Sequence, residues 1–203
     1  MLPVLGISMG DPAGIGAEIA VKALAKNDWT QKCIPVVVGD AAAMEDAIAF
    51  TGCDCRLNRI EDPAQAVNEK GVINLIDLGF LAPHSWEYKK VSALAGKAAF
   101  HYVRVATELA MQGKTDAIVT GPINKEAINL AGFHYSGHTE ILADLTGTKN
   151  YAMLLTGGNL RVIHVTTHVS MREACDRITK ERVYTVIRLA RQAMELLGMP
   201  NAK

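Results

Sequence analysis

Thr120-Gly-Pro-Ile-Asn-Lys125 opens the stretch that decides the fold, which continues through Ser136-Gly-His-Thr-Glu140 to Val162-Ile-His-Val-Thr-Thr-His168. Apolar runs that suit buried strands alternate with helical patterns around these three polar motifs. Such alternation predicts an α/β fold, a layered and mostly parallel sheet with helices on both faces. In open sheets of this kind, ligands sit outside the carboxyl ends of the strands. The polar side chains at these element edges are therefore the first candidates for a functional site.

The rest of the chain repeats the same pattern of strand, turn and helix. Helices are expected where apolar residues recur every three or four positions, and strands where β-branched runs are short. The expected strands span residues 4–9, 34–38, 53–60, 72–76, 116–120, 151–155 and 160–165, and the expected helices 17–25, 41–50, 91–111, 125–130, 141–145 and 179–197. Asp40 and Asn124 stand where helix-capping residues belong. The last two strands are expected to form a hairpin.

Composition excludes several classes of function. Lys plus Arg and Asp plus Glu each number 21, and the charges are interspersed, so a nucleic-acid-binding protein is not expected. No apolar run reaches the roughly 18 residues of a membrane span, and the first residues suit a strand better than a signal peptide. The four cysteines fit no zinc module and are expected to be reduced core residues. We therefore expect a cytoplasmic protein with neither a nucleic-acid nor a membrane partner.

A glycine-rich turn, Gly10-Asp-Pro-Ala-Gly-Ile-Gly16, follows the first expected strand. It matches neither the dinucleotide-binding fingerprint nor a P-loop. Its backbone N–H groups can approach a phosphate or another anion. The alternative is a tight strand-to-helix turn without a ligand. The residues alone leave both interpretations open.

Lys125, His138 and Thr139 are candidates because each stands at the start of an expected helix. A lysine is electrostatically disfavoured there, so an anionic group is expected near Lys125, with a solvated lysine as the alternative. His138 and Thr139 lie where free N–H groups and the helix dipole favour an anion. For Thr139, a capping role is the alternative.

His168 is the candidate metal ligand. Alternation along the last expected strand places His164, Thr166 and His168 on one face, with His168 at the strand exit and His164 assigned to packing. One histidine cannot hold a catalytic metal, which usually needs about three protein ligands. The residues alone therefore predict an enzyme or binding domain for a small molecule, with an anion-binding cleft that His138 and His168 share.

The glycine turn, Thr120-Gly-Pro-Ile-Asn-Lys125, Gly137-His-Thr-Glu140 and Val165-Thr-Thr-His168 together resemble the 4-hydroxythreonine-4-phosphate dehydrogenase family. That family includes relatives acting on 4-phospho-D-threonate and 4-phospho-D-erythronate. Each motif is weak alone, but four in order are specific, and the resemblance covers the whole chain. The glycine turn also resembles that of isopropylmalate and isocitrate dehydrogenases, which share the broader fold.

The resemblance implies NAD-dependent oxidation of the C3 hydroxyl of a 4-phosphorylated hydroxy acid. With 4-hydroxythreonine 4-phosphate, loss of CO2 then gives 3-amino-2-oxopropyl phosphate, in pyridoxal phosphate biosynthesis. A divalent metal (Zn, Mg, Mn or Co) would polarise the hydroxyl. By motif, His138 and Thr139 would bind substrate and His168 would bind the metal. Lys125 is our own candidate for proton transfer or carboxylate binding, and no residue is assigned to NAD.

The resemblance also implies a homodimer with its site at the subunit interface. Family members continue further, with Asn-Pro-His and Tyr-His-Asp-Gln-Gly motifs supplying two more metal histidines, so the chain is expected to be an N-terminal portion. Its expected division is a first α/β portion, residues 1–120, and an incomplete second portion with the histidine motifs, residues 121–203. Alone, it is expected to be inactive and to bind metal weakly. The alternatives are a 4-phospho-D-threonate or 4-phospho-D-erythronate dehydrogenase of sugar-acid catabolism, and a non-catalytic phosphate-ligand binding fragment.

Overall fold

A computed structural model describes residues 1–201 of the chain. The chain divides into two compact units, Met1–Thr146 and Gly147–Lys203. The boundary lies further along the chain than the division expected after residue 120. Residues 121–146, which carry two of the three polar motifs, therefore belong to the same compact unit as the glycine turn.

The first unit is built on a parallel sheet, as the sequence predicted. Within the described residues, its strands are β1 (Val4–Ser8), β2 (Ile34–Gly39), β3 (Arg56–Ile60), β4 (Val72–Asp77) and β5 (Ala117–Thr120). They lie in the order β3-β4-β2-β1-β5, and every neighbouring pair is parallel. β1 and β5 end at the same level because Ser8 pairs with Thr120.

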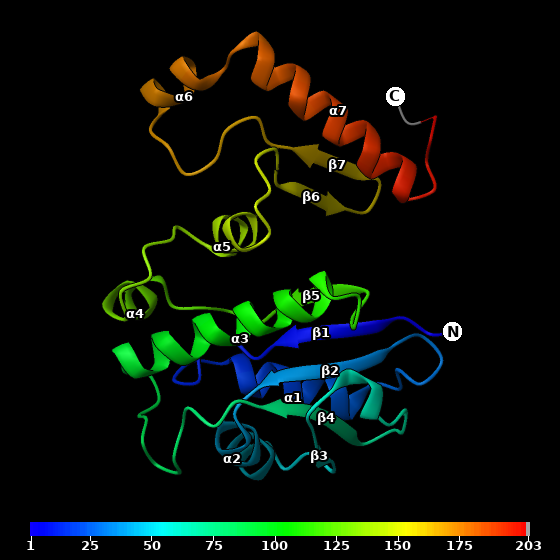
Figure 1. Ribbon diagram of the computed structural model, residues 1–203, viewed down its shortest axis with the longest axis vertical. Helices are drawn as coiled ribbons and strands as arrows, with labels where there is room; N and C mark the ends of the chain where they lie inside the picture. The colour runs from blue at the N-terminus through cyan, green and yellow to red at the C-terminus, as the bar shows by residue number, and fades with distance from the viewer. Residues whose placement is uncertain (202–203) are drawn as a thin grey trace. The chain divides into compact units, whose positions relative to one another are not determined.

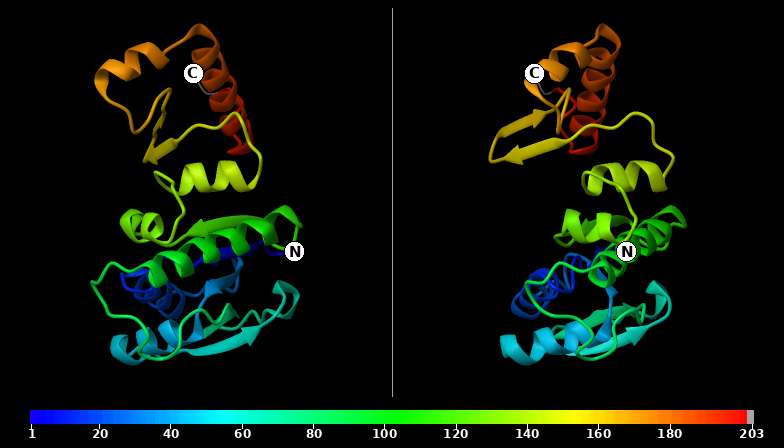
Figure 2. Two further views of the ribbon diagram at one scale, coloured as in Figure 1. Left: turned by 60° about the vertical axis from the view of Figure 1, so that its left-hand side comes forward. Right: turned by 90° about the vertical axis from the view of Figure 1, so that its left-hand side faces the viewer.

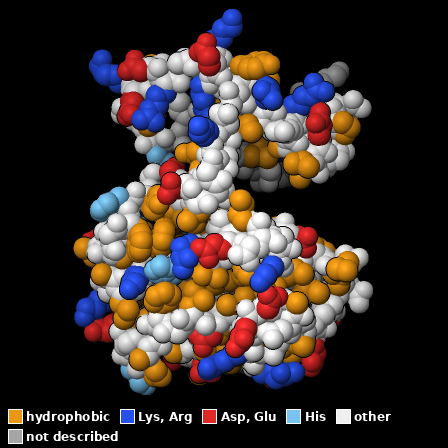
Figure 3. Space-filling view, in the orientation of Figure 1, with side chains coloured by type: hydrophobic (Ala, Val, Ile, Leu, Met, Phe, Trp, Pro, Cys, Tyr) orange, Lys and Arg blue, Asp and Glu red, His pale blue; other side chains and the backbone are white. Residues whose placement is uncertain are grey.

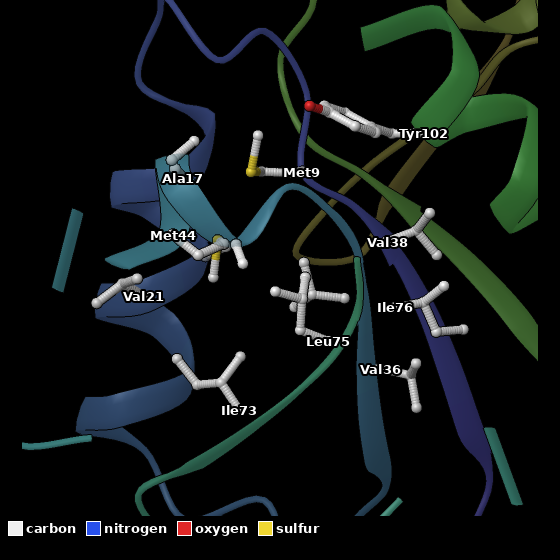
Figure 4. Packing of buried hydrophobic residues seen from close by; sticks show 14 of the residues in the cluster. Met9, Ala17, Val21, Val36, Val38, Met44, Ile73, Leu75, Ile76 and Tyr102 are labelled. Atoms are coloured by element: carbon white, nitrogen blue, oxygen red, sulfur yellow. The ribbon is translucent and has the colours of Figure 1, made fainter. Parts of the chain in front are cut away.

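Helices cover both faces of this sheet (Figures 1 and 2). The helices of the unit are α1 (Gly16–Lys26), α2 (Ala41–Thr51), α3 (Ala93–Met111), α4 (Lys125–Leu130) and α5 (His138–Leu145), with a short 3-10 turn at Pro63–Gln65. α1 and α2 lie on one face and α3 on the other. Apolar side chains from the strands and from all three helices form the main core, and Figure 4 shows Met9, Met44 and Leu75 packed within it.

Local signals set several of the helix ends. The Asn124 side chain accepts a hydrogen bond from the Ala127 N–H at 3.0 Å, which confirms the predicted cap of α4. α2 stops at Gly52, whose φ of 62° is the left-handed conformation that favours glycine at a helix end. On α3, Gly96 allows close packing, because a β-carbon there would lie 1.9 Å from the Ala127 carbonyl oxygen of α4. A second apolar cluster joins α3, α4 and α5.

Within residues 147–201, the second unit contains an antiparallel hairpin and two helices. Its elements are β6 (Leu154–Gly157), β7 (Leu160–Ile163), α6 (Met171–Arg177) and α7 (Lys180–Leu196). The predicted hairpin and the long final helix are confirmed, while both strands are shorter than expected. Thr179 caps α7 by accepting from the Arg182 N–H. The Arg182 guanidinium in turn donates to the Val165 and Tyr151 carbonyl oxygens at 2.9 and 3.1 Å. These bonds join α7 to the segment that precedes β6 and to the segment that follows β7.

The surface carries charges of both signs, interspersed on the face drawn in Figure 3. Among residues 1–201, no helix is both long and apolar enough to cross a membrane. The cysteines are free, and Cys33 is buried as expected, whereas Cys175 is exposed on α6 and is not a core residue.

Candidate functional site

The carboxyl ends of β1 and β5 form the part of the sheet where a ligand is expected. α1 leaves β1 on one face of the sheet, and α3 reaches β5 along the other, so the chain reverses its winding direction between these two strands. Crevices at such reversals bind ligands in open α/β sheets. The segments that follow the two strands are the glycine turn and the Gly121–Asn124 segment, and both belong to predicted motifs.

Backbone hydrogen bonds hold these two segments together. The Asp11 N–H donates to the Pro122 carbonyl oxygen, and the Gly121 N–H donates to the Ser8 carbonyl oxygen, both at 2.8 Å. Gly10, at φ 86°, leaves no room for a side chain, since a β-carbon would lie 2.4 Å from the Pro122 carbonyl oxygen. The sequence thus needs a glycine here for both conformation and space.

The glycine turn satisfies much of its own backbone. The Asp11 carboxylate accepts from the Ala13 N–H at 2.8 Å, and the Asp11 carbonyl oxygen accepts from the Gly14 N–H at 3.1 Å. Asp11 is almost fully buried, and burial raises the pKa of its carboxyl group, although the bond from Ala13 opposes the shift. Of the two interpretations of the sequence, the tight turn describes these contacts better than a cradle that offers its N–H groups to a phosphate.

His138 is the first residue of α5 and lies half-buried next to the Gly121 segment. Burial lowers the pKa of its imidazole, and a hydrogen bond with the Gly121 backbone opposes that shift. Its Nε2 atom is buried and has no partner among residues 1–201. Because burial disfavours the charged ring, His138 is a neutral side chain near pH 7 with one nitrogen free for a ligand.

Lys125 and Thr139 lie at the same place. Gly137 precedes α5, and a β-carbon added to it would lie 4.0 Å from Cε of Lys125 and 3.6 Å from Oε2 of Glu140. Thr139 follows His138 in the first turn and is half-buried. The α5 N-terminus has no side-chain cap within the described residues, so Thr139 does not have the capping role considered as its alternative. The structure therefore brings Lys125, His138 and Thr139 together, while their roles stay predictions.

His168 belongs to the second unit and does not lie on a strand. β7 ends at Ile163, so the expected alternation of His164, Thr166 and His168 along one strand face is wrong. His168 is exposed and has a φ of 57°, a conformation that is uncommon for any residue but glycine. Such backbone outliers gather at functional sites, which is consistent with a ligand role. That its ring meets His138 in one cleft stays a prediction.

No complete metal site is present in the part of the chain that the structure describes. Residues 1–201 contain no group of three His, Cys, Asp or Glu side chains that could hold an ion. His168 can contribute one ligand at most, so these residues do not fit a resident metal without further ligands.

Sequence reasoning missed a buried polar pair at the same edge of the sheet. Asp40 was expected to cap α2, but its side chain makes no capping bond there. The Asp77 carboxylate at the end of β4 accepts from the Ala41 N–H instead, at 3.0 Å. Asp40 accepts from the Tyr102 hydroxyl of α3 and from the Leu81 N–H. An aspartate directly after a strand was the available signal, but the sequence could not show which way its side chain points.

The chain is similar to proteins of one family over most of its length. The family model "Pyridoxal phosphate biosynthetic protein PdxA" matches residues 31–203. A Clostridium botulinum protein named "Putative D-threonate 4-phosphate dehydrogenase" is 42% identical over 201 residues, which are 99% of this chain and 60% of the relative. An Oceanobacillus iheyensis protein of the same name is 43% identical, again with 60% of the relative covered.

Two crystal structures give the corresponding result for the fold. A 4-hydroxythreonine-4-phosphate dehydrogenase from Burkholderia phymatum is 45% identical with a TM-score of 0.86, over 96% of this chain and 58% of that one. The Klebsiella pneumoniae enzyme of that name is 41% identical with a TM-score of 0.91, over 100% and 61% of the two chains. The chain thus spans about three fifths of the length of the relatives it matches.

Proposed function

Because the chain belongs to the family of the pyridoxal phosphate biosynthetic protein PdxA, we propose that it forms part of an NAD-dependent and divalent-metal-dependent dehydrogenase. The reaction is oxidation of the C3 hydroxyl of a four-carbon acid that is phosphorylated at C4. We propose 4-hydroxythreonine 4-phosphate as the substrate, with decarboxylation to 3-amino-2-oxopropyl phosphate, in pyridoxal phosphate biosynthesis. The names of the two similar crystal structures support this choice.

A second candidate is the oxidation of 4-phospho-D-threonate or 4-phospho-D-erythronate in sugar-acid catabolism. The names of the Clostridium botulinum and Oceanobacillus iheyensis relatives favour it. The two kinds of substrate differ at C2, which carries an amino group in one and a hydroxyl group in the others. Both share the phosphate, the carboxylate and the C3 hydroxyl, so one arrangement of anion-binding groups suits both.

The observation that carries the proposal is the convergence of three predicted residues at the α5 N-terminus. His138 offers a neutral imidazole whose free nitrogen can accept a hydrogen bond from a substrate hydroxyl. Thr139 adds a hydroxyl group beside it. Lys125 lies near Gly137, where its ammonium group would bind the substrate carboxylate; in the alternative proton-transfer role, its neutral amine would accept the proton that leaves the C3 hydroxyl.

The metal requirement rests on the family resemblance, with His168 as one proposed ligand. The described residues supply no further ligand set, so the remaining ligands would have to come from outside residues 1–201. A homodimer rests on the same resemblance, whereas a cytoplasmic location rests on the composition of the sequence. The alternative for this chain by itself is a non-catalytic domain that binds a phosphorylated ligand through the α5 N-terminus.

NADH formation tests the proposal directly. The assay combines NAD, a divalent metal and each of the three phosphorylated acids with either this chain or a version extended to the length of its relatives. We expect turnover by the extended version and little by this chain. Preference for the amino acid or for the sugar acids decides between the two candidate substrates. If the extended version produced no NADH from any of the three, the dehydrogenase proposal would be wrong.

A further inference from the structure

The connection between β4 and α3, residues 78–92, crosses the same edge of the sheet as the candidate site. It is fastened near its start, where the Leu78 N–H donates to the Gly39 carbonyl oxygen at 2.9 Å and the Leu81 N–H donates to Oδ1 of Asp40 at 3.1 Å. Near its end, the Lys89 N–H donates to the Ala13 carbonyl oxygen of the glycine turn at 2.8 Å. The connection therefore joins the Asp40 pair to the glycine turn.

The Asp40 side chain binds this connection and does not cap α2. Asp40 is 1% exposed, and its side chain makes no capping hydrogen bond to the first turn of α2. Both of its oxygens accept hydrogen bonds, one from the Leu81 N–H and the other from the Tyr102 hydroxyl. Among the described residues it has no ion-pair partner. Burying a carboxyl group destabilises a fold unless the group is hydrogen-bonded. The bonds from Leu81 and Tyr102 therefore stabilise buried Asp40 in place of the capping bond that it does not make.

Tyr102 fixes the carboxyl group from the other side. Its side chain is completely buried on α3, and Figure 4 shows its ring at the edge of the main core with the hydroxyl pointing away from the helix. Burial and the neighbouring carboxylates raise the pKa of this hydroxyl, so it stays a proton donor to Asp40. The pair is thus a rigid anchor between α3, β2 and the connection.

The β4–α3 connection leads from this anchor at Leu81 to Lys89, and a series of contacts leads from Lys89 to the candidate site. The Lys89 N–H donates to the Ala13 carbonyl oxygen, and the Asp11 N–H of the same turn donates to the Pro122 carbonyl oxygen. The neighbouring Gly121 backbone is hydrogen-bonded to the His138 ring. Lys89 itself has a φ of 64°, an unfavourable conformation for lysine, so its surroundings must hold it in place.

We propose that Asp40 and Tyr102 are positioning residues that hold the β4–α3 connection against the glycine turn and so fix the environment of His138. The inference rests on the proposed function in that His138 is taken to bind substrate. Neither Asp40 nor Tyr102 is proposed to touch the substrate. Loss of the anchor should loosen the connection and the glycine turn first, while the sheet stays folded.

Amide hydrogen exchange on the 203-residue chain tests the first part. In Tyr102→Phe and Asp40→Ala, we expect the Lys89 and Asp11 N–H groups to exchange about tenfold faster relative to the Val37 N–H of β2, because a buried hydrogen bond is lost. Asp40→Asn should stay near the wild type, since its amide can accept from Leu81 and donate to the Tyr102 oxygen.

Thr107→Val is the matched control for Tyr102→Phe. It also removes one buried hydroxyl group from α3, but Thr107 bonds only to the Val103 carbonyl oxygen of its own helix. It should change exchange at Lys89 and Val37 by the same factor. If Tyr102→Phe and Asp40→Ala also changed the exchange rates of the Lys89 and Val37 N–H groups by equal factors, the proposal would be overturned.

The second measurement is an NMR titration of the His138 ring. Burial lowers the pKa of this ring and the hydrogen bond to the Gly121 backbone raises it, so a loosened Gly121 segment should shift the pKa in Tyr102→Phe and Asp40→Ala but not in Thr107→Val. An unchanged His138 titration beside faster Lys89 exchange would refute the link to the site. Neither readout needs turnover, so an inactive enzyme would count against the proposed function alone.

Discussion

Replacement of Gly96 by alanine should displace α4, which carries Lys125. The added β-carbon would lie 1.9 Å from the Ala127 carbonyl oxygen, whereas real β-carbons essentially never come closer than 3.0 Å to a neighbouring atom, so the helices must separate by at least about 1.1 Å. Overpacking of this kind costs about 1–3 kcal/mol, and more where backbone has to move. Alanine is favoured over glycine inside a helix by about 1 kcal/mol, which offsets part of that cost. Because the clashing atom belongs to the backbone, the cost lies at the upper end of that range, and we expect a net loss of about 2 kcal/mol.

Thermal unfolding followed by circular dichroism measures this loss. For a domain of this size, 2 kcal/mol lowers Tm by roughly 4–8 °C. The clash involves the backbone of Ala127, so adding Ala127→Gly should not restore Tm. Gly52→Ala separates backbone strain from the clash: no described atom lies within 4 Å of an added β-carbon there, so only the strain of its positive φ should lower Tm, and by less than in Gly96→Ala. A Tm for Gly96→Ala at or above the wild type, or rescue by Ala127→Gly, would refute the reasoning.

Three further predictions concern the candidate site. Burial lowers the pKa of His138 from its ordinary value of 6.5. The stability that the neutral ring contributes should therefore be complete above pH 6.5 and be lost as the pH falls through the lowered pKa. The difference in urea midpoint between wild type and His138→Gln should shrink on acidification. Isothermal titration of this chain with zinc should show no tight stoichiometric binding, and a tight site would contradict the incomplete ligand set. In an extended, active version, His168→Ala should abolish most of the metal-dependent NADH formation, and unimpaired activity would end the metal assignment.

The regular elements of the first unit were predictable because their signals are local. Asn124 caps α4 through its own side chain, and Gly52 ends α2 in the left-handed conformation, so each helix end is encoded within a few residues. The apolar runs of β1, β2 and β4 are continuous because helices cover both faces of the sheet. The same local signals placed Lys125, His138 and Thr139 at helix starts, while their roles stay predictions.

Features that depend on distant parts of the chain were not predictable. β7 stops at Ile163 although the β-branched pattern runs on to Thr167, and instead of extending the strand the Val165 carbonyl oxygen accepts from Arg182 of α7. Asp40 bonds to Leu81 and Tyr102, which are 41 and 62 residues away along the chain, so its sequence neighbours suggested only a helix cap. The left-handed backbone of His168 likewise has no signature in residue type.

The parts of the site in the first unit are joined mainly through backbone atoms, and this has a consequence for interpreting substitutions. Asp11 bonds to Pro122 and Gly121 to Ser8 through main-chain groups, so replacing the His138 side chain leaves both contacts in place. His138→Gln keeps an amide that can replace the ring's hydrogen bond to the Gly121 backbone. It should therefore keep Tm within a few degrees of the wild type while weakening ligand binding. Collapse of the first unit in His138→Gln would mean that the ring itself holds the segments together, and its assignment to substrate would lose its support.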